Sequence, residues 1–278
     1  MKGRDGFDAF YRAIYRDRWD ALKSALDAPA QSTPITVADG PEYYLDPASI
    51  VAALCLEVAP GDRVLDLCAA PGGKSLVMAS RIGEGGSLTS NERSATRRAR
   101  LHRVLAEHLP AELLERITVT SHDASRWALY EPAAYDRVLA DVPCSSERHV
   151  LHAPAELAKW SATRTKRLAT GAYAIACAAA DALRPGGRMV YSTCTISPIE
   201  NDGVIVRLLA RPKGARVACV DLPSVLRRAG TGAGSGAVAG AAGTPTAHGE
   251  PTEHGWMILP DSCAGAGPMY IAVLERRA

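Results

Sequence analysis

The sequence predicts an α/β domain whose sheet is mostly parallel, Rossmann-like and covered by helices on both faces. Two observations predict it. From residue 47 onward, short apolar runs alternate with amphipathic stretches, which is the pattern of repeated strand–helix units. The first run, "RVLDLC", leads into a turn of small residues and glycines, "AAPGGK", and then into a predicted helix. In parallel sheets such a turn lies at the carboxyl edge, where ligands bind.

The N-terminal part of the chain is predicted to be a helical leader followed by a linker. Residues 7–26 place large apolar side chains at steps of three and four, the spacing of an amphipathic helix. A proline-bearing linker follows it. Asp46 and Pro47 then have the residue types of a helix N-cap and a first helical position. We therefore expect a leader and linker over 1–46 and one larger domain over 47–278.

The larger domain contains five apolar strand candidates, at 63–68, 87–92, 117–123, 135–142 and 187–194. Helices are predicted between them, at 74–81, 94–108, 154–183 and 199–210. The runs "WMILP" and "GPMYIAVLERR" close the chain as a pair of antiparallel strands. Residues 228–255 are rich in alanine and glycine and too poor in large apolar side chains to pack, which predicts a flexible insertion.

Composition excludes several classes of protein. Hydrophobic content of 47% and charged content of 22% are typical of soluble globular chains. No apolar run reaches the roughly 18–20 residues of a membrane span, and the first ten residues lack a signal-peptide core. Seven cysteines without zinc-like spacing predict reduced thiols and no metal site, so we expect a cytoplasmic location.

The net charge of +2 is too small to establish a polyanionic partner. Five arginines nevertheless crowd into eleven residues: Arg93, Arg97, Arg98, Arg100 and Arg103. Such a cluster is more often a solvated helix face than a binding site.

The glycine turn predicts a ligand site that is not a phosphate loop. Gly73-Lys74-Ser75 fits the end of the phosphate-loop pattern, but Cys68 occupies the position of its first glycine. The G-x-G-x-x-G spacing of a dinucleotide site is absent too. Small residues here would let a ligand lie against bare backbone. The residues expected to do this are Cys68, Ala69, Ala70, Pro71, Gly72, Gly73 and Lys74.

Acidic residues at the next two strand ends indicate the kind of ligand. Glu92 is placed to accept hydrogen bonds from both hydroxyls of a ribose. Asp123, at the end of the third strand, is placed to reach an adenine edge. An adenosine that carries a cation rather than phosphates fits this set, and S-adenosylmethionine is such a ligand. A Rossmann-like turn of unassigned use is the alternative.

Five motifs, in this order, resemble the Nop/Sun (RsmB-like) family of S-adenosylmethionine-dependent RNA cytosine-5 methyltransferases: "DLCAAPGGKS", "SNERSATR", "SHDAS", "ADVPCSSERH" and "YSTCTISPIEND". The resemblance covers residues 40–210 and resumes at "GPMYIAVLERR", which is similar to the ending of the mitochondrial ribosomal-RNA member. It implies a class I methyltransferase fold with a seven-stranded sheet. It also implies cofactor binding by residues 68–74, Glu92, Arg97, Asp123, Ala124 and Asp141. Two departures, Glu92 for a frequent aspartate and Val142 for a frequent proline, remove no functional atom.

The reaction of that family accounts for two thiols. Carbon 5 of cytosine is too electron-poor to attack a methyl sulfonium, but a thiolate that adds at carbon 6 makes carbon 5 nucleophilic. A carboxyl group that hydrogen-bonds N3 and the exocyclic amine, for which Asp141 is suited, would stabilise the charge that develops on the ring. After methyl transfer the carbon 5 proton must leave so that the thiol can be eliminated. A second group beside the adduct has to assist that step.

Physical reasoning from the sequence does not decide which of the two thiols attacks the base and which assists release. Cys144 and Cys194 both follow a predicted sheet strand. Analogy with DNA cytosine-5 methyltransferases would make Cys144 the attacking thiol, but the Glu-Asn-Val motif of those enzymes is absent here. The resemblance to the RNA family implies that Cys194 attacks and that Cys144 assists release. The alternative is that Cys144 is only a small buried residue and has no chemical role.

RNA is the expected substrate, because a cytosine must be single-stranded, looped or flipped out to reach a thiol. The arginine cluster, together with Arg164, Lys166 and Arg167, would hold phosphates. We expect small-subunit ribosomal RNA as the target, with transfer RNA next. A catalytically silent ribosome-assembly factor is the alternative from another class, although such a protein has no reason to keep both thiols.

The motifs do not show which part of the protein selects the target RNA. Only 46 residues precede Pro47. We therefore expect the target to be chosen by the catalytic domain, by that leader or by an accessory targeting protein, and we expect the protein to be monomeric.

Overall fold

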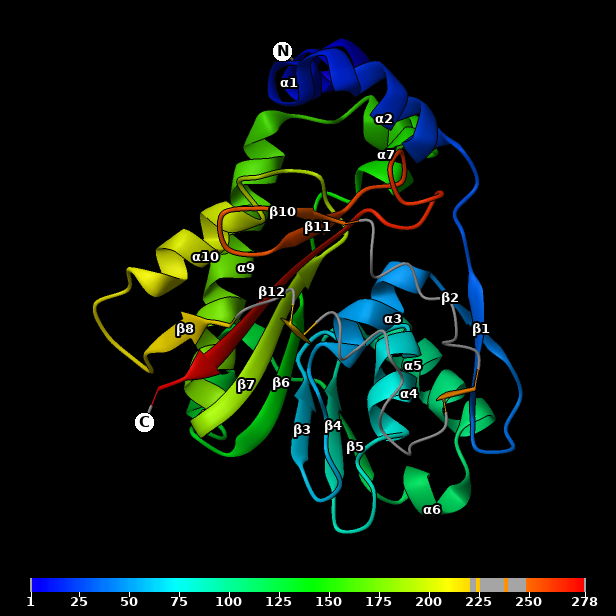
Figure 1. The fold of residues 1–278 in the computed structure, drawn as a ribbon, viewed down its shortest axis with the longest axis vertical. Coiled ribbons are helices and arrows are strands. Elements are labelled where there is room, and N and C mark those ends of the chain that lie inside the picture. Colours follow the sequence, from blue (N-terminus) through cyan, green and yellow to red (C-terminus); the bar gives the residue numbers. More distant parts are fainter. Residues whose placement is uncertain (1, 221–223, 226–237, 240–248, 278) are drawn as a thin grey trace.

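The computed structural model describes residues 2–220, 224–225, 238–239 and 249–277. Its centre is a nine-stranded sheet of order β10-β11-β12-β7-β6-β3-β4-β5, with β8 paired to β12 (Figure 1). The parallel strands are β3 (Arg63–Asp66), β4 (Ser87–Asn91), β5 (Ile117–Thr120), β6 (Tyr135–Asp141) and β7 (Leu183–Thr193). The predicted α/β class is confirmed, with nine strands rather than seven.

The C-terminal part of the sheet is antiparallel, as predicted. β12 (Met269–Arg276) pairs with β7, with β11 (Trp256–Ile258) and with β8 (Val217–Cys219). Most of the predicted insertion, 228–255, lies outside the described residues. Its final part packs, because β10 (Glu250–Pro251) pairs with β11, so regular structure resumes before the predicted strand at Trp256.

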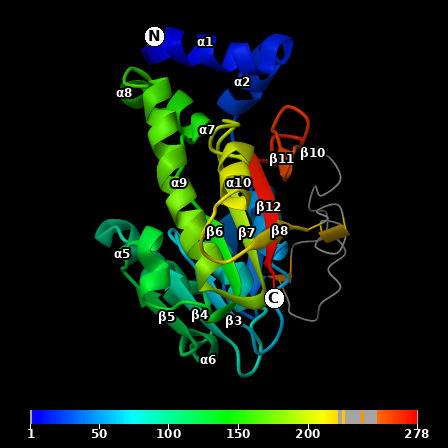
Figure 2. The ribbon, with the colours of Figure 1, turned by 90° about the vertical axis from the view of Figure 1, so that its left-hand side faces the viewer.

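Helices cover both faces of the sheet (Figures 1 and 2). One face carries α3 (Pro47–Leu54), α4 (Gly73–Ala79), α5 (Ala95–His108) and α6 (Ala111–Leu114). The other carries η2 (Ala124–Leu129), α9 (Ala162–Ala182) and α10 (Asp202–Leu209). The predicted helix 154–183 is divided into α8 (Pro154–Leu157) and α9, and α7 (Glu147–Leu151) precedes them. None of the described helices has the length and apolar content of a membrane span.

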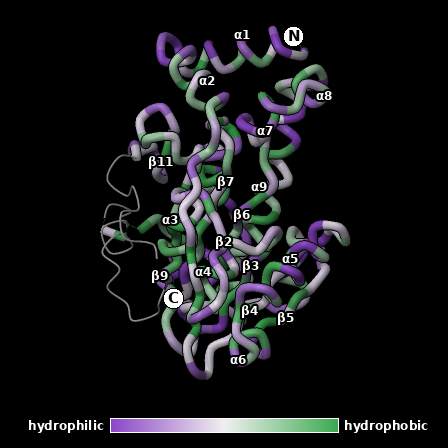
Figure 3. The backbone as a smooth tube through the Cα atoms, turned by 90° about the vertical axis from the view of Figure 1, so that its right-hand side faces the viewer, coloured by the Kyte–Doolittle hydropathy of each residue, from purple (hydrophilic) through white to green (hydrophobic). Residues whose placement is uncertain are grey.

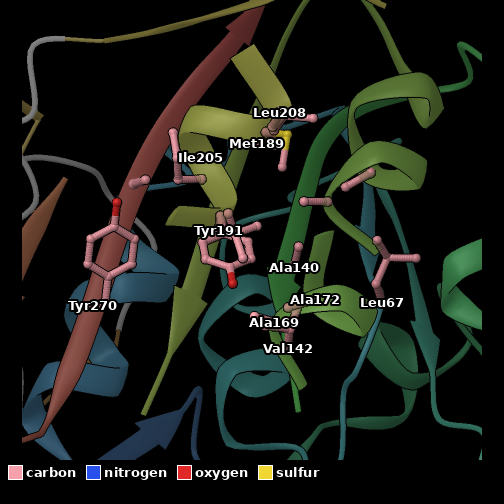
Figure 4. Packing of buried hydrophobic residues seen from close by; sticks show 14 of the residues in the cluster. Leu67, Ala140, Val142, Ala169, Ala172, Met189, Tyr191, Ile205, Leu208 and Tyr270 are labelled. Carbon is pink, nitrogen blue, oxygen red and sulfur yellow. The ribbon is translucent and has the colours of Figure 1, made fainter. Parts of the chain in front are cut away.

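Alternate residues of the central strands fill the two cores. Val138 and Ala140 of β6 belong to the core beneath α9, whereas Leu139 between them packs on the α3–α4 side. Both faces of the strand are therefore buried, which explains its continuous apolar sequence. Figure 3 shows the hydrophobic segments gathered at these strands and the helices against them, and Figure 4 shows Ala140 and Tyr191 near Ala172 of α9.

The predicted helix over 7–26 is two helices, α1 (Gly3–Tyr15) and α2 (Trp19–Asp27). A 3₁₀ turn, η1 (Arg16–Arg18), separates them because Arg16 adopts a left-handed φ of 51°. Both helices still bury their large side chains in the core they share with α9. The rings of Tyr11 and Trp19 stack with centroids 5.4 Å apart.

The predicted linker also contains regular structure. β1 (Thr33–Val37) pairs antiparallel with β2 (Tyr43–Leu45) and, at its other edge, with β9 (Val238–Ala239). These strands are too short for sequence periodicity to identify. The predicted cap is confirmed, since Asp46 Oδ1 accepts the Ala48 N–H at 2.7 Å and Pro47 opens α3.

Because Trp19 is fully buried in the shared core, Trp19→Ala should lower the free energy of unfolding by about 3–5 kcal/mol. Chemical denaturation should show a single transition, displaced as a whole. Leu129→Ala, at a residue that is 71% exposed, is the control and should leave the midpoint unchanged. A separate early transition that alone responds to Trp19→Ala would mean that α1 and α2 fold independently.

Candidate active site

One buried side chain joins the carboxyl ends of β3, β4 and β5. The Asn91 amide nitrogen donates to the Leu67 carbonyl at 3.0 Å and to the His122 carbonyl at 3.1 Å. Its amide oxygen accepts from the His122 N–H at 2.8 Å and from Thr120 Oγ1 at 2.9 Å. The turn after β3 and the segment after β5 are thus fixed to the end of β4. Sequence reasoning missed this role of Asn91.

The glycine turn lies above a buried carboxyl group. Asp66, at the end of β3, accepts from the Ser75 hydroxyl at 2.7 Å. Its other oxygen, Oδ1, is buried and has no hydrogen-bond partner among the residues that the structure describes. Burial raises the pKa of Asp66 to about 7.

The two central glycines of the turn lie against neighbouring side chains. Gly72 has a φ of +123°, and a Cβ there would meet Val104 Cγ1 at 2.9 Å. A Cβ at Gly73 would meet Leu45 Cδ1 at 2.8 Å. The missing side chains therefore make room for α5 and for β2, and the expectation that they also let a ligand approach the backbone stays a prediction.

The residues predicted to bind a nucleoside lie along this edge. Glu92 is almost fully buried, accepts from the Ser94 N–H at 2.8 Å and lies 3.3 Å from Arg97 Nη1. Arg97 also donates to the Ala70 carbonyl of the turn at 2.7 Å. The structure thus brings Glu92 and Arg97 together above the turn.

Asp123 follows β5 on the same edge and caps η2, in which Ala124 is buried. The Ser125 hydroxyl donates to Asp123 Oδ1 at 2.7 Å and lowers the pKa of this carboxyl group. Arg93 Nη1 lies 3.1 Å from the other oxygen.

Three arginines of the predicted cluster contact the protein itself. Arg93 pairs with Asp123, Arg97 bridges Glu92 and the turn, and Arg98 donates to the Glu92 carbonyl at 2.9 Å. Arg100 and Arg103 are exposed. The cluster is thus partly structural. Neither of the two interpretations from the sequence, a solvated helix face or a surface that holds phosphates, predicted this.

Cys144 and Cys194 form a pair of thiols beyond the ends of β6 and β7. Their sulfur atoms are 3.2 Å apart. The Ser146 hydroxyl lies 3.1 Å from Cys194 Sγ and 3.5 Å from Cys144 Sγ. Ser146 has a left-handed φ of 50°, where the chain turns from β6 into α7. Cys194 is exposed and Cys144 is half-buried.

The surroundings separate the acidities of the two thiols. Hydrogen bonds from Cys144 and from Ser146, together with the nearby Lys74 ammonium, lower the pKa of Cys194. The hydrogen bond to Cys194 and burial raise the pKa of Cys144. In this arrangement Cys194 is the more acidic of the two thiols.

Asp141 connects the thiols to the glycine turn. Its carboxylate lies 2.9 Å from Lys74 Nζ and accepts from the Ser192 hydroxyl at 2.7 Å. Lys74 also lies 3.2 Å from Ser49 Oγ. Burial disfavours its charged form, but Asp141 outweighs burial and the pKa of Lys74 is raised. Lys74, predicted only as part of the turn, therefore stays an ammonium group between turn and thiols.

A cavity of about 360 Å³ opens beside Cys194, which is room for a nucleobase. One wall is Gly267–Met269, at the start of β12. Another is formed by Arg148, His149 and His152, in and just after α7. Asp46, Ser49 and Ser146 also line the cavity, and sequence reasoning did not select the two serines for the site.

Comparison with known proteins gives a consistent match. The chain matches the 16S rRNA methyltransferase RsmB/F family over residues 53–273. It is 35% identical over 243 residues to the 5-cytosine rRNA methyltransferase NSUN4 of Bos taurus, covering 84% of this chain and 60% of the relative. It is 34% identical over 235 residues to the mitochondrial tRNA (cytosine(34)-C(5))-methyltransferase of Mus musculus, covering 84% and 63%. The chain thus spans about three fifths of these relatives.

The fold is shared with a methyltransferase homolog protein from Pyrococcus horikoshii. The TM-score is 0.68 and the identity 17%, over 96% of this chain and 93% of that one. At this identity the likeness concerns the fold alone. It confirms the predicted Rossmann-like α/β fold, in which this chain places the glycine turn and both thiols on one edge of the sheet.

The buried Asp66 carboxyl group predicts a pH dependence of stability. An unfolded aspartate titrates near pH ~4, so between there and about pH 7 the folded chain keeps a proton that unfolding releases. Stability therefore falls as pH rises through this window, by up to about 1.4 kcal/mol per unit. Asp66→Asn should make the fall of the melting temperature shallower between about pH 4.5 and 7.5.

Asp20→Asn is the control, because that carboxylate is exposed and paired with Arg12. It should leave the slope over this window as in the wild type. A wild-type slope in Asp66→Asn would show that Asp66 is ionised in the folded protein, contrary to the argument from burial.

Proposed function

The chain belongs to the RsmB/F family of rRNA methyltransferases, and from that premise we propose that it methylates carbon 5 of a cytosine in RNA. The observation that carries the proposal is the pair of thiols, 3.2 Å apart, beside Asp141. One thiol suffices to attack a base. A second one in contact with it is expected where a covalent adduct must also be resolved.

The proposed cofactor is S-adenosylmethionine, which supplies an electrophilic methyl group. The residues present fit it, because carboxylates stand at the ends of β4 and β5 and the nearby basic groups, Arg97 and Lys74, are paired with carboxylates. Glu92 would hold the ribose hydroxyls and Asp123 the adenine edge. The remaining contacts would come from residues 68–74, Arg97, Ala124 and Asp141.

Cys194 is the proposed nucleophile. Its sulfur is exposed beside the cavity and lies 3.2 Å from Cys144 Sγ and 3.1 Å from Ser146 Oγ, and these contacts lower the pKa of Cys194. Addition of this thiolate to carbon 6 would form a carbon–sulfur bond and place the electron pair of the ring double bond at carbon 5. Carbon 5 would use that pair to take the methyl group, and the sulfonium sulfur would keep the electrons of the broken sulfur–methyl bond and leave as a neutral thioether.

Asp141 would hold N3 and the exocyclic amine of the cytosine, with its carboxylate oriented by Ser192 and Lys74. Release would then need loss of the carbon 5 proton, with its electron pair restoring the double bond and expelling the Cys194 thiolate. Cys144 is the proposed assisting group, because its sulfur contacts the attacking sulfur. Once Cys194 has become a thioether, Cys144 as a thiolate would accept the carbon 5 proton.

We propose small-subunit ribosomal RNA as the target, because the family that matches is described by that substrate. Transfer RNA is the second candidate, since a relative named for tRNA is as similar as one named for rRNA. Bisulfite sequencing of RNA from a deletion strain would separate them. We also propose a reducing compartment such as the cytoplasm, because two thiols in contact must stay reduced to serve these roles.

The roles of the thiols predict opposite phenotypes. Cys144→Ala should still attack and methylate RNA but fail to release it, so a covalent protein–RNA complex should accumulate on a denaturing gel. Cys194→Ala should give neither complex nor methylated product with labelled cofactor. The double mutant should behave like Cys194→Ala.

Cys219→Ala is the matched control, since this exposed cysteine lies on β8, away from the thiol pair. It should methylate like the wild type. Trapping by Cys194→Ala instead would reverse the roles, and activity in both single mutants without any complex would exclude the covalent mechanism. No methyl transfer by the wild type to any RNA would favour an assembly factor.

A further inference from the structure

We call residues 142–147, from the end of β6 to the first residue of α7, the Cys144 loop, and residues 194–201, between β7 and α10, the Cys194 loop. A buried carboxylate of the Cys144 loop holds the Cys194 loop. Glu147 lies three residues after Cys144 and is fully buried. It accepts the Thr195 hydroxyl at 2.9 Å and the Ile196 N–H at 3.0 Å. Both donors follow Cys194 directly in the chain.

A second carboxylate makes the reciprocal connection. Glu200, in the loop after Cys194, is also fully buried. Its carboxyl group accepts two hydrogen bonds from the Cys144 loop, one from the Ser145 N–H at 2.9 Å and one from the Ser145 hydroxyl at 2.5 Å. Each thiol loop thus supplies one glutamate that binds the residue next to the other thiol. We call Glu147 and Glu200 the carboxylate clamp.

The N-terminal helix α1 anchors this clamp from outside the sheet. The Tyr11 hydroxyl donates to the Glu147 carboxylate, and the Tyr15 hydroxyl donates to the Ile196 carbonyl at 2.7 Å. Tyr11 is fully buried, with its ring against Phe7 and Trp19. Aromatic packing therefore fixes where its hydroxyl lies.

Two buried carboxylates this close together are costly to stability. Burial raises the pKa of Glu147, and it raises the pKa of Glu200 to about 8. Apolar side chains of similar size often stabilise such a site better than buried charges do. The clamp contacts instead fall on Ser145 and Thr195, each adjacent to a thiol, where small displacements would change the distance between the sulfur atoms.

We propose that Glu147, Glu200, Tyr11 and Tyr15 are positioning residues that set the contact between the two thiols, which makes α1 part of the catalytic apparatus. The consequence for methyl transfer rests on the proposed function. The positioning of the two thiols does not rest on the proposed function, because the reactivity of Cys194 can be measured without RNA or cofactor.

Tyr11→Phe tests the proposal with the smallest change, since it keeps the packed ring and removes one hydroxyl. Glu147 would lose a donor, its hold on Thr195 and Ile196 would loosen, and Cys144 would donate less well to Cys194. The rate of Cys194 alkylation by iodoacetamide, with the site identified by mass spectrometry, should therefore reach half its maximum at a higher pH. Asp141 and Lys74 still face the sulfur, so the shift reports on the thiol contact.

Methylation by Tyr11→Phe should fall at least tenfold in kcat with little change in KM for the cofactor, because the hydroxyl of Tyr11 binds Glu147 and not a proposed cofactor residue. Tyr15→Phe should shift the alkylation profile and lower kcat in the same direction but more weakly, since the Tyr15 hydroxyl binds only the Ile196 carbonyl. Tyr44→Phe is the matched control: it removes an exposed tyrosine–glutamate hydrogen bond, to Glu42 at 2.9 Å, and should change neither profile nor kcat.

A lower melting temperature in Tyr11→Phe with a wild-type alkylation profile would overturn the proposal, because Tyr11 would then be merely structural. A shifted profile together with reduced kcat would support it. A shifted profile in a protein that methylates no RNA, even as wild type, would support the positioning role while the proposed function fails.

Discussion

Parallel pairing of β6 with β7 is the constraint on which the site depends. In this register Asp141 lies opposite Ser192, so Cys144 and Cys194 leave the sheet from neighbouring strand ends. A slip of one residue would turn Asp141 to the other face of the sheet and separate it from Ser192 and Lys74. The two apolar cores fix this register, because alternate residues of β6 are buried on opposite sides.

The positions of the strand ends could be predicted, and with them the edge where the chemistry lies, because apolar runs that stop at polar residues report burial directly. Contacts between distant segments could not. Glu147 stands in the charged run "SSERH", where a glutamate normally indicates surface, and only tertiary packing buries it against Tyr11. The break at Arg16 escaped prediction because both halves keep the same helical spacing.

The charge balance of the site fits a positively charged methyl donor. Carboxyl groups surround the turn and the thiols, and Lys74 is the ammonium group that pairs with Asp141 among them. The acidity of Cys194 owes more to hydrogen bonds from Cys144 and Ser146 than to that cation. A thiolate supported in this way depends on geometry and is less sensitive to salt than one held by surface charges.

The place of β12 has a consequence for biosynthesis. It lies between β7 and β11, yet it is translated after every other strand of the sheet, and Gly267–Met269 at its start form a wall of the cavity. A nascent chain still lacking β12 has its thiol loops but an incomplete cavity, with one edge of β7 unpaired. Such an edge invites pairing with other chains, so the interval before β12 emerges is when the protein is most exposed to aggregation and when chaperones would matter most to its yield.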